Sequence, residues 1–263
     1  MSSSLKIVAI ITARMGSSRF PGKPLAPILG MPMVEHVRRR VAMCEVLDDV
    51  YVATCDREIY DSTVSFGGKA VMTSDVHQRA SDRVAEVAKD MEADVFVLVQ
   101  GDEPMTVPEM IERAVEPMLK DHTIGCVNLS KRITSEREWN DPNTIKVVTD
   151  INGEALYFSR QPIPADRILG WDKIPLFKQV CIIPFRRETI LSYAALPPTE
   201  LEKSESVDMM RFLEHGMKVR MVETEFDTFA VDTPEDLVRV ENMMREDELT
   251  RSYISHMDWF QGY

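Results

Sequence analysis

The chain has 263 residues, of which 44% are hydrophobic and 28% charged, which excludes a disordered chain and allows one large domain with a sizeable core. Its net charge of −12 argues against non-specific binding to nucleic acid or to an anionic membrane. The N-terminus lacks the basic and apolar regions of a signal peptide, and no apolar run reaches about 18 residues, so we expect a cytoplasmic protein without a membrane span.

The first half of the chain alternates apolar runs with amphipathic segments. Residues 5–12 form a continuous apolar run, which is typical of a strand buried on both faces of a parallel sheet. Further strands are predicted at 49–54, 70–72 and 94–99, and helices at 34–44, 59–66, 81–91 and 108–120. This alternation predicts βαβ units, and therefore an α/β fold with a Rossmann-like, mostly parallel sheet.

The segment from 124 to 184 has a different character. Strand patterns at 124–129, 144–149, 155–158 and 180–184 are separated by loops, and Gly153 lies in a turn between two of them. We expect an inserted antiparallel segment that extends the sheet or forms a lobe for binding the acceptor and for dimerisation. A homodimer is therefore the predicted assembly.

The C-terminal part is predicted to return to helices. One helix is expected over 205–216 with Gly216 at its C-terminal cap, followed by a short strand from Phe229. The next helix is predicted to begin at Pro234, with Thr233 as its N-cap and Asp236 completing a capping box. We expect a single domain over 1–246 and leave the tail, 247–263, without an assigned structure.

The four cysteines are Cys44, Cys55, Cys126 and Cys181. They are widely spaced and form no CxxC pair. We therefore expect reduced thiols, most of them buried, rather than a disulfide framework or a zinc site.

The loop after the first predicted strand is the strongest local signal for function. Arg14, Arg19 and Lys23 lie within ten positions of one another among glycine and proline residues, in a protein that is strongly acidic overall. Loops at the carboxyl ends of strands bind ligands in open α/β sheets, and backbone amides together with cations bind polyphosphates. The loop matches neither GxxxxGK[ST] nor GxGxxG. The alternative is a solvated basic loop.

Two aspartates follow apolar runs in a similar way. Asp102 lies in Gln100-Gly-Asp-Glu-Pro, directly after the strand predicted at 94–99, and Asp232 follows the short strand from Phe229. Carboxylates from two strand ends can share a hard divalent cation, so Mg²⁺ is the predicted cofactor, bound together with a triphosphate. The alternative for Asp232 is a residue that merely precedes a helix cap.

Several motifs resemble 3-deoxy-manno-octulosonate cytidylyltransferase, the CMP-Kdo synthetase family, in the family's order over about residues 5–245. The matching segments are Ala13-Arg14, Ser18-Arg19, Pro21-Gly22-Lys23-Pro24-Leu25, Val71-Met72-Thr73 with His77-Gln78, Val99-Gln-Gly-Asp-Glu-Pro-Met105, Ile145-Lys-Val-Val148, Ala155-Leu-Tyr-Phe-Ser-Arg-Gln-Pro-Ile-Pro164 and Val231-Asp-Thr-Pro-Glu-Asp-Leu237. The resemblance implies an α/β nucleotidyltransferase core with a dimerisation segment. It also implies CTP and an acidic sugar as substrates, for lipopolysaccharide or capsule biosynthesis.

The resemblance also implies roles for individual residues. The segment with Ala13, Arg14, Ser18, Arg19 and Lys23, together with Arg83 and Gln100, corresponds to the nucleotide site. Lys23, Arg14, Asp102 and Asp232 correspond to the catalytic set, with the two aspartates as metal ligands. Gln100, Arg160, Gln179 and Asp208 correspond to the acceptor site.

The chain departs from the family pattern on the acceptor side. Gln179 replaces a histidine, Ile183 a tyrosine, Asp208 a glutamate and Met209 a glutamine. Lost polar partners weaken the binding of sugar hydroxyls, so we expect an acceptor that is less hydroxylated than Kdo or differently substituted. The alternatives are Kdo itself held by compensating contacts, another keto-deoxy acid or a phosphonate, and a non-catalytic nucleotide-binding or structural homologue.

Overall fold

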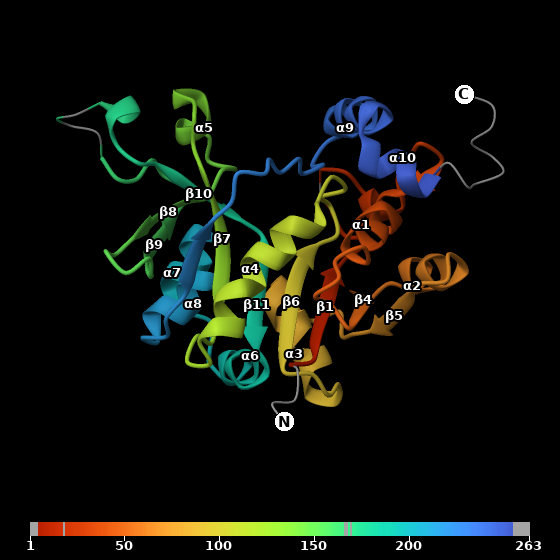
Figure 1. Ribbon diagram of the computed structural model, residues 1–263, viewed down its shortest axis with the longest axis horizontal. Coiled ribbons are helices and arrows are strands. Elements are labelled where there is room, and N and C mark those ends of the chain that lie inside the picture. Colours follow the sequence, from red (N-terminus) through yellow and green to blue (C-terminus); the bar gives the residue numbers. More distant parts are fainter. Residues whose placement is uncertain (1–4, 18, 166–167, 169, 255–263) are drawn as a thin grey trace.

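Figure 1 shows the computed structural model, which describes residues 5–17, 19–165, 168 and 170–254. A five-stranded sheet in the order β11-β6-β1-β4-β5 forms its centre. The parallel strands are β1 (Ile7–Thr12), β4 (Asp49–Thr54), β5 (Lys69–Met72) and β6 (Val95–Gln100), and β11 (Ile182–Arg186) pairs antiparallel with β6. The predicted α/β class with a mostly parallel sheet is confirmed.

Helices cover both faces of this sheet. Because successive side chains of a strand point to opposite faces, Ile7, Ala9 and Ile11 pack in one core and Val8 and Ile10 in another. The first core includes α1 (Met33–Val41) and α4 (Pro108–Lys120), which lie on the near side in Figure 1. The second includes α3 (Ala80–Asp90), α6 (Arg187–Ala194) and α8 (Met209–Glu214). Helix α2 (Arg57–Ser65) joins β4 to β5.

The inserted segment provides four strands of a second sheet, in the order β12-β7-β10-β8-β9, and the remaining strand, β12, comes from the C-terminal part. Its strands are β7 (Val127–Arg132), β8 (Lys146–Thr149), β9 (Ala155–Ser159), β10 (Phe177–Val180) and β12 (Arg220–Glu223), and α5 (Glu136–Asn140) and a short 3₁₀ helix (Trp171–Lys173) lie in its loops. The predicted antiparallel segment is confirmed, since only β12 and β7 are parallel. The bridge between Cys126 and Phe185 connects the two sheets.

Three elements differ from the prediction. The single strand expected at 180–184 is two strands, because the chain passes from β10 in one sheet to β11 in the other at Cys181. Of the helix expected over 205–216, only α8 is formed; a separate helix, α7 (Glu200–Glu205), ends before it, where Ser206 has a left-handed conformation with φ 56°. The strand expected from Phe229 is absent, and residues 224–232 have no regular secondary structure.

The predicted capping box is present at the start of α9 (Pro234–Glu246). Thr233 Oγ accepts a hydrogen bond from the amide of Asp236, whose carboxylate accepts one from the amide of Thr233. The following segment, for which no structure is predicted, forms α10 (Glu248–Ile254) up to the end of the described residues. Residues 255–263 of the predicted tail lie outside them.

Helix α10 contacts α1 through buried polar groups. His36 Nε2 donates to the Ile28 carbonyl at 2.8 Å, and His36 Nδ1 lies 2.8 Å from the Tyr253 hydroxyl, which therefore donates to it. The fully buried Arg40 bonds Tyr253, Thr250 and Asp247. These contacts make α10 part of the packed structure.

Two further observations concern cysteines and membranes. All four cysteines carry free thiols, with Cys44 and Cys126 buried and Cys55 and Cys181 partly exposed. Among the described residues, no helix is both long and apolar enough to cross a membrane.

Candidate active site

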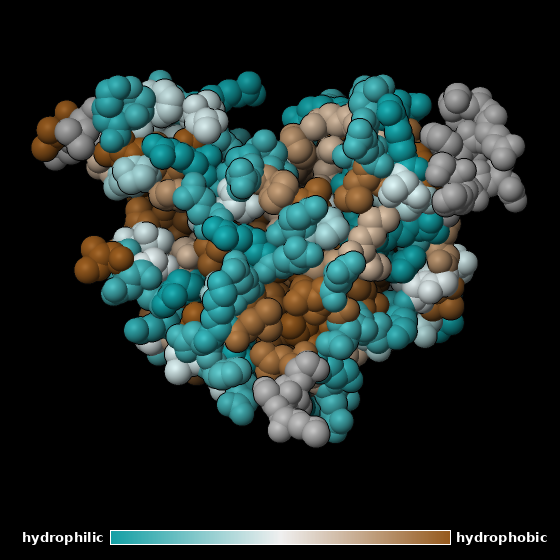
Figure 2. Space-filling view, in the orientation of Figure 1, coloured by the Kyte–Doolittle hydropathy of each residue, from teal (hydrophilic) through white to brown (hydrophobic). Residues whose placement is uncertain are grey.

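A cavity of about 390 Å³ lies at the carboxyl ends of β1 and β6. In the space-filling view, the outline of the molecule is indented between the part that carries α5 and the part that carries α9 (Figure 2). The cavity wall carries the cationic side chains of Arg14, Arg19, Lys23, Arg79 and Arg83. It carries fewer carboxylates, those of Asp102, Asp208 and Asp232. An acidic protein thus has a locally cationic cavity, as an anionic ligand requires.

Two features define the backbone path of the loop after β1. The amide of Met15 donates to the Asp56 carboxylate at 2.7 Å, which ties the loop to the end of β4. Gly22 has φ 74°, a left-handed conformation that glycine adopts without steric cost. It immediately precedes a short 3₁₀ helix (Lys23–Leu25), and Lys23 is thereby directed into the cavity wall with only 8% of its surface exposed.

A second loop begins at the same level of the sheet. Thr12 and Gln100 are register partners, and the Gly101 amide donates to the Thr12 carbonyl at 3.0 Å. A Cβ atom at position 101 would lie 2.8 Å from that carbonyl oxygen, so the close approach of the two loops requires glycine. Asp102 is consequently directly beside the loop that carries Lys23.

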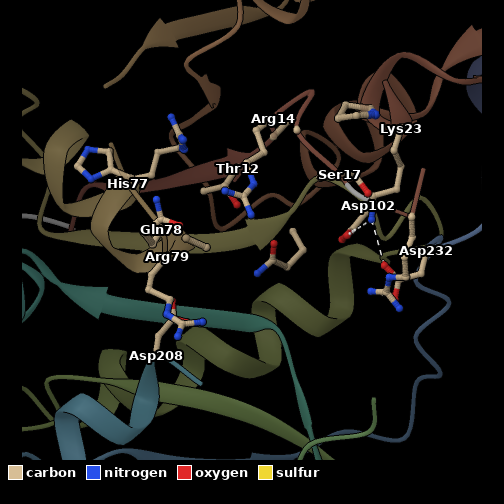
Figure 3. A pocket seen from close by; sticks show the side chains of 18 residues that line it. Thr12, Arg14, Ser17, Lys23, His77, Gln78, Arg79, Asp102, Asp208 and Asp232 are labelled. Carbon is tan, nitrogen blue, oxygen red and sulfur yellow. Dashed lines mark hydrogen bonds and ion pairs between the residues drawn. The ribbon is translucent and has the colours of Figure 1, made fainter. Parts of the chain in front are cut away.

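Lys23, Asp102 and Asp232 converge at one end of the cavity (Figure 3). Lys23 Nζ donates to Asp102 Oδ2 at 2.6 Å and to Asp232 Oδ1 at 3.2 Å, while Arg19 lies 3.1 Å from the other oxygen of Asp232. Asp232 comes from the far end of the chain and is held there because the Val231 amide donates to the Asp102 carbonyl at 2.9 Å. One cation therefore contacts both carboxylates.

This geometry suits a divalent metal ion that also binds substrate oxygens. Carboxylate oxygens are the ligands that Mg²⁺ prefers, and Mg²⁺ is commonly held by one or two carboxylates plus phosphates. No group of three or more His, Cys, Asp or Glu side chains arranged for a metal ion occurs among residues 5–17, 19–165, 168 and 170–254. Asp102 and Asp232 thus fit a metal whose remaining ligands come from a phosphate and water.

The opposite wall comes from the start of α3. Arg83 is 4% exposed, and its guanidinium donates to the Ser74 carbonyl at 3.3 Å and contacts Thr73 and Cys55. Arg79 precedes the helix, and Figure 3 shows it beside Asp208, away from the end that holds Lys23. The predicted nucleotide residues Ala13, Arg14, Arg19, Lys23, Arg83 and Gln100 all line the cavity, and Ser18 lies outside the described residues.

Of the four residues predicted to bind the acceptor, two line the cavity and two do not. Gln100 and Asp208 line the cavity, whereas Arg160 and Gln179 are not among its lining residues. The guanidinium of Arg160 donates to the backbone carbonyls of Glu205 at 2.7 Å and Pro142 at 3.0 Å. The side-chain amide of Gln179 donates to Asn128 at 2.6 Å. Gln179 is therefore engaged within the inserted segment, and Arg160 links that segment to α7.

Other lining residues received no role from the sequence. His77, Gln78 and Arg79 follow β5 and precede α3, and all three line the cavity. The rule that ligands bind beyond the carboxyl ends of parallel strands points to this segment as well as to the loops after β1 and β6. The short predicted strand at 70–72 is the signal that identifies it.

Comparison with known proteins identifies the family. The cytidylyltransferase family model matches residues 8–219. The 3-deoxy-manno-octulosonate cytidylyltransferase of Trichlorobacter lovleyi is 43% identical over 251 residues, which cover 92% of this chain and 100% of that protein. The corresponding protein of Solibacter usitatus is 44% identical over 240 residues, covering 91% of this chain and 95% of its own.

Solved structures support the same family assignment. The structure of CMP:2-keto-3-deoxy-manno-octonic acid synthetase complexed with CTP superposes with a TM-score of 0.86 at 39% identity, covering 92% of this chain and 99% of that one. A more distant match, 4-diphosphocytidyl-2C-methyl-D-erythritol synthase from Anaerococcus prevotii, has a TM-score of 0.63 at 16% identity and shows the fold alone. The family expected from the sequence motifs is confirmed: the chain belongs to the 3-deoxy-manno-octulosonate cytidylyltransferase family.

Proposed function

We propose that the protein transfers CMP from CTP to 3-deoxy-manno-octulosonate (Kdo) or a related acidic sugar, with release of pyrophosphate. The observation that carries this proposal is the position of Lys23 between Asp102 and Asp232 in a cationic cavity. Such a site suits a triphosphate and a metal, and the names of the relatives indicate the cytidine and the sugar acid. Because the reaction consumes CTP, we also propose the cytoplasm as its compartment.

In the proposed reaction, an acceptor hydroxyl oxygen bonds to the α-phosphorus of CTP while the bond from that phosphorus to pyrophosphate breaks. Arg14, Arg19 and Lys23 offset the charge on the phosphates and on the leaving pyrophosphate. Mg²⁺ held by Asp102 and Asp232 would neutralise further charge on the phosphates when bound. The cavity holds the two substrates in place, so positioning contributes to the rate.

The nucleotide end is assigned to the loop after β1 and to α3. We propose that Ala13, Arg14, Ser18, Arg19, Lys23, Arg83 and Gln100 bind CTP. Small residues and glycines in the loop permit backbone amides to approach phosphate oxygens. The described members of this set line one cavity, which supports the assignment.

The acceptor end supports a second candidate, an acidic acceptor other than Kdo. Ile183 and Met209, which stand where the family has polar groups, are 4% and 0% exposed and pack in the hydrophobic core. Gln179 is paired with Asn128. Gln100 and Asp208 remain on the cavity wall. We propose that the acceptor is contacted by fewer polar side chains here than in the family pattern. This favours a less hydroxylated or differently substituted acid.

We also propose a homodimer that uses the inserted segment, residues 124–184. Strand β9 ends the order of the second sheet, and Leu156 within it is 60% exposed. Part of the β9 edge is covered, because the Phe158 amide donates to Met210 Sδ, so the exposed Leu156 side chain is the feature that indicates an association surface. Light scattering of the wild type and of Leu156→Asp tests this: a dimer that becomes monomeric supports the proposal, and a monomeric wild type contradicts it.

The function is tested by pyrophosphate release. Each of the four nucleoside triphosphates is supplied with each member of a panel of acidic sugars, with Mg²⁺ or with EDTA. We expect release with CTP and a keto-deoxy acid in Mg²⁺ alone. Release with another nucleotide and none with CTP would contradict the proposal, as would the lack of release with every pair.

A further inference from the structure

We propose that Asp208 is a positioning residue for the nucleotide end of the cavity, and that it acts by capping α3. Asp208 Oδ2 accepts hydrogen bonds from the amide of Ser81 at 3.1 Å and from its hydroxyl at 2.8 Å. The first amides of a helix have no acceptor within the helix. Arg79, which precedes α3, supplies no side-chain cap. A carboxylate 127 positions away in the chain therefore performs the capping.

The first turn of α3 carries the cations of this wall. Arg79 and Arg83 flank the capped residue and both line the cavity. Ser81 is fully buried, and Asp208, which is partly buried, lines the same cavity. Since Asp208 already occupies the Ser81 amide, that amide is satisfied by the protein, and the phosphates are left to the loop after β1.

The same part of the chain holds α3 at a second point. Arg211 is 3% exposed and donates to Asp82 at 2.9 Å and to Glu202 at 2.6 Å. Arg79 donates to the Ser206 hydroxyl at 2.7 Å. Residues 202–211, which we term the α7–α8 segment, thus bind Arg79, Ser81 and Asp82 at the start of α3.

The α7–α8 segment also holds the inserted sheet. The carboxylate of Glu205 accepts hydrogen bonds from Ser159 at 3.0 Å and from the amide of Arg160 at 2.8 Å. Its carbonyl accepts from the Arg160 guanidinium at 2.7 Å. The α7–α8 segment consequently fixes α3 relative to β9, with Asp208 on the α3 side of this connection.

The assignment rests on the proposed function, because CTP is the proposed ligand, but CTP affinity is measured directly and needs no turnover. Calorimetry with CTP and Mg²⁺ is compared for wild type, Asp208→Ala, Asp208→Asn, Ser81→Ala and the double variant Asp208→Ala/Ser81→Ala. We expect Asp208→Ala to weaken CTP binding about tenfold, because displacement of Arg79 and Arg83 would cost about one charge-assisted contact to the nucleotide. Asp208→Asn keeps an acceptor oxygen, so its affinity for CTP should lie between those of Asp208→Ala and the wild type. The double variant should bind CTP no more weakly than Asp208→Ala, because the side chains of Asp208 and Ser81 act as one contact.

Two readouts separate positioning from a direct acceptor contact. The KM of the acceptor at saturating CTP should stay within about twofold of the wild type, and amide hydrogen exchange at Ser81 should accelerate in Asp208→Ala. Asp121→Ala is the matched control, because Asp121 likewise accepts from the amide and hydroxyl of one residue, Thr123, away from the cavity. It should leave CTP affinity unchanged.

The proposal is overturned if Asp208→Ala and Asp208→Asn bind CTP as the wild type does, with or without a raised KM for the acceptor. If Asp208→Ala does not fold, Asp208→Asn and Ser81→Ala carry the same comparison. If no acceptor is turned over, the proposed function fails, while CTP affinity and exchange at Ser81 still decide the role of Asp208.

Discussion

Lys23 Nζ lies 2.6 Å from the Asp102 carboxylate, although 79 positions separate the two residues in the chain. The side chain of Lys23 is 11% exposed and that of Asp102 30%, so the pair is partly shielded from water. Charge-assisted contacts in such surroundings are stronger than those at an open surface. The pair joins the loop that provides cations to the loop that provides carboxylates.

Removing the Lys23 ammonium should impair the use of CTP. We expect Lys23→Ala to lower kcat/KM for CTP about 30-fold, which corresponds to about 2 kcal/mol for one charge-assisted contact. Steady-state kinetics, with circular dichroism to establish folding, measure the effect. Lys69→Ala is the control, because Lys69 also pairs with an aspartate, Asp49, but is largely exposed and lies outside the cavity. A folded Lys23→Ala protein with wild-type kcat/KM would contradict the assignment.

Activity should depend on a divalent metal and on both aspartates. We expect no turnover in EDTA, and at least about 100-fold lower kcat in Asp102→Asn and Asp232→Asn, since an amide offers a metal no charge. Mg²⁺ titrations of initial rate give the measurement. Asp227→Asn, which alters an exposed ion pair with Lys131, serves as the control and should behave as the wild type. Full activity in chelator, or in either variant, would remove the proposed metal site.

Acid should weaken the contact between α1 and α10. Burial and, to a lesser extent, the neighbouring Arg40 lower the pKa of His36 from 6.5 to about 4. Between pH 6.5 and 4, the unfolded chain therefore binds a proton at this histidine that the folded chain does not. The unfolding free energy should decrease as pH falls through this window, by about 1.4 kcal/mol per pH unit and about 3 kcal/mol in all from His36.

Urea unfolding at pH 7 and pH 5 tests this dependence. His36→Gln can still donate to the Ile28 carbonyl and accept from Tyr253, but it does not titrate. Its unfolding free energy should decrease less between the two pH values than that of the wild type. His122→Gln, at an exposed position, should keep the wild-type slope. Equal slopes for His36→Gln and the wild type would show that His36 is not responsible.

Acceptor preference should differ from that implied by the family name. With Ile183 and Met209 buried, two polar partners are lost at about 1 kcal/mol each, so we expect a less hydroxylated or differently substituted acid to exceed Kdo about 30-fold in kcat/KM. The panel of acidic acceptors at saturating CTP gives the ratio. The KM for CTP should be the same with each acceptor. If Kdo is used as efficiently as any other acid, the departures at these positions have no effect on specificity.

The sequence predicted best what depends on local patterns. The apolar runs that became β1 and β6 are buried on both faces, and Thr233 and Asp236 form the predicted capping box because it involves only neighbouring residues. The cationic loop and Asp102 follow from these strands, since a loop after a parallel strand lies at the ligand-binding edge.

The predictions that were wrong concern features determined by contacts between residues far apart in the chain. Residues on both sides of Cys181 are apolar, so nothing local shows that Val180 and Ile182 belong to different sheets. The break at Ser206 has no glycine or proline to signal it. The left-handed turn is held by contacts from Arg79 and Arg160, each more than forty positions away. The roles of Arg160 and Gln179 depended on side-chain directions, which sequence patterns do not specify.

The close approach of Gly101 to the Thr12 carbonyl has a consequence for chimeric proteins. Because the loops after β1 and β6 start from one shared hydrogen bond, neither can change its backbone path without moving the other. Exchanging residues 12–25 alone with a relative would combine two loops that were not selected together, whereas exchanging 12–25 and 100–106 as a pair preserves their junction. In recombination between relatives, these two stretches behave as one module, even though the residues between them form most of the parallel sheet.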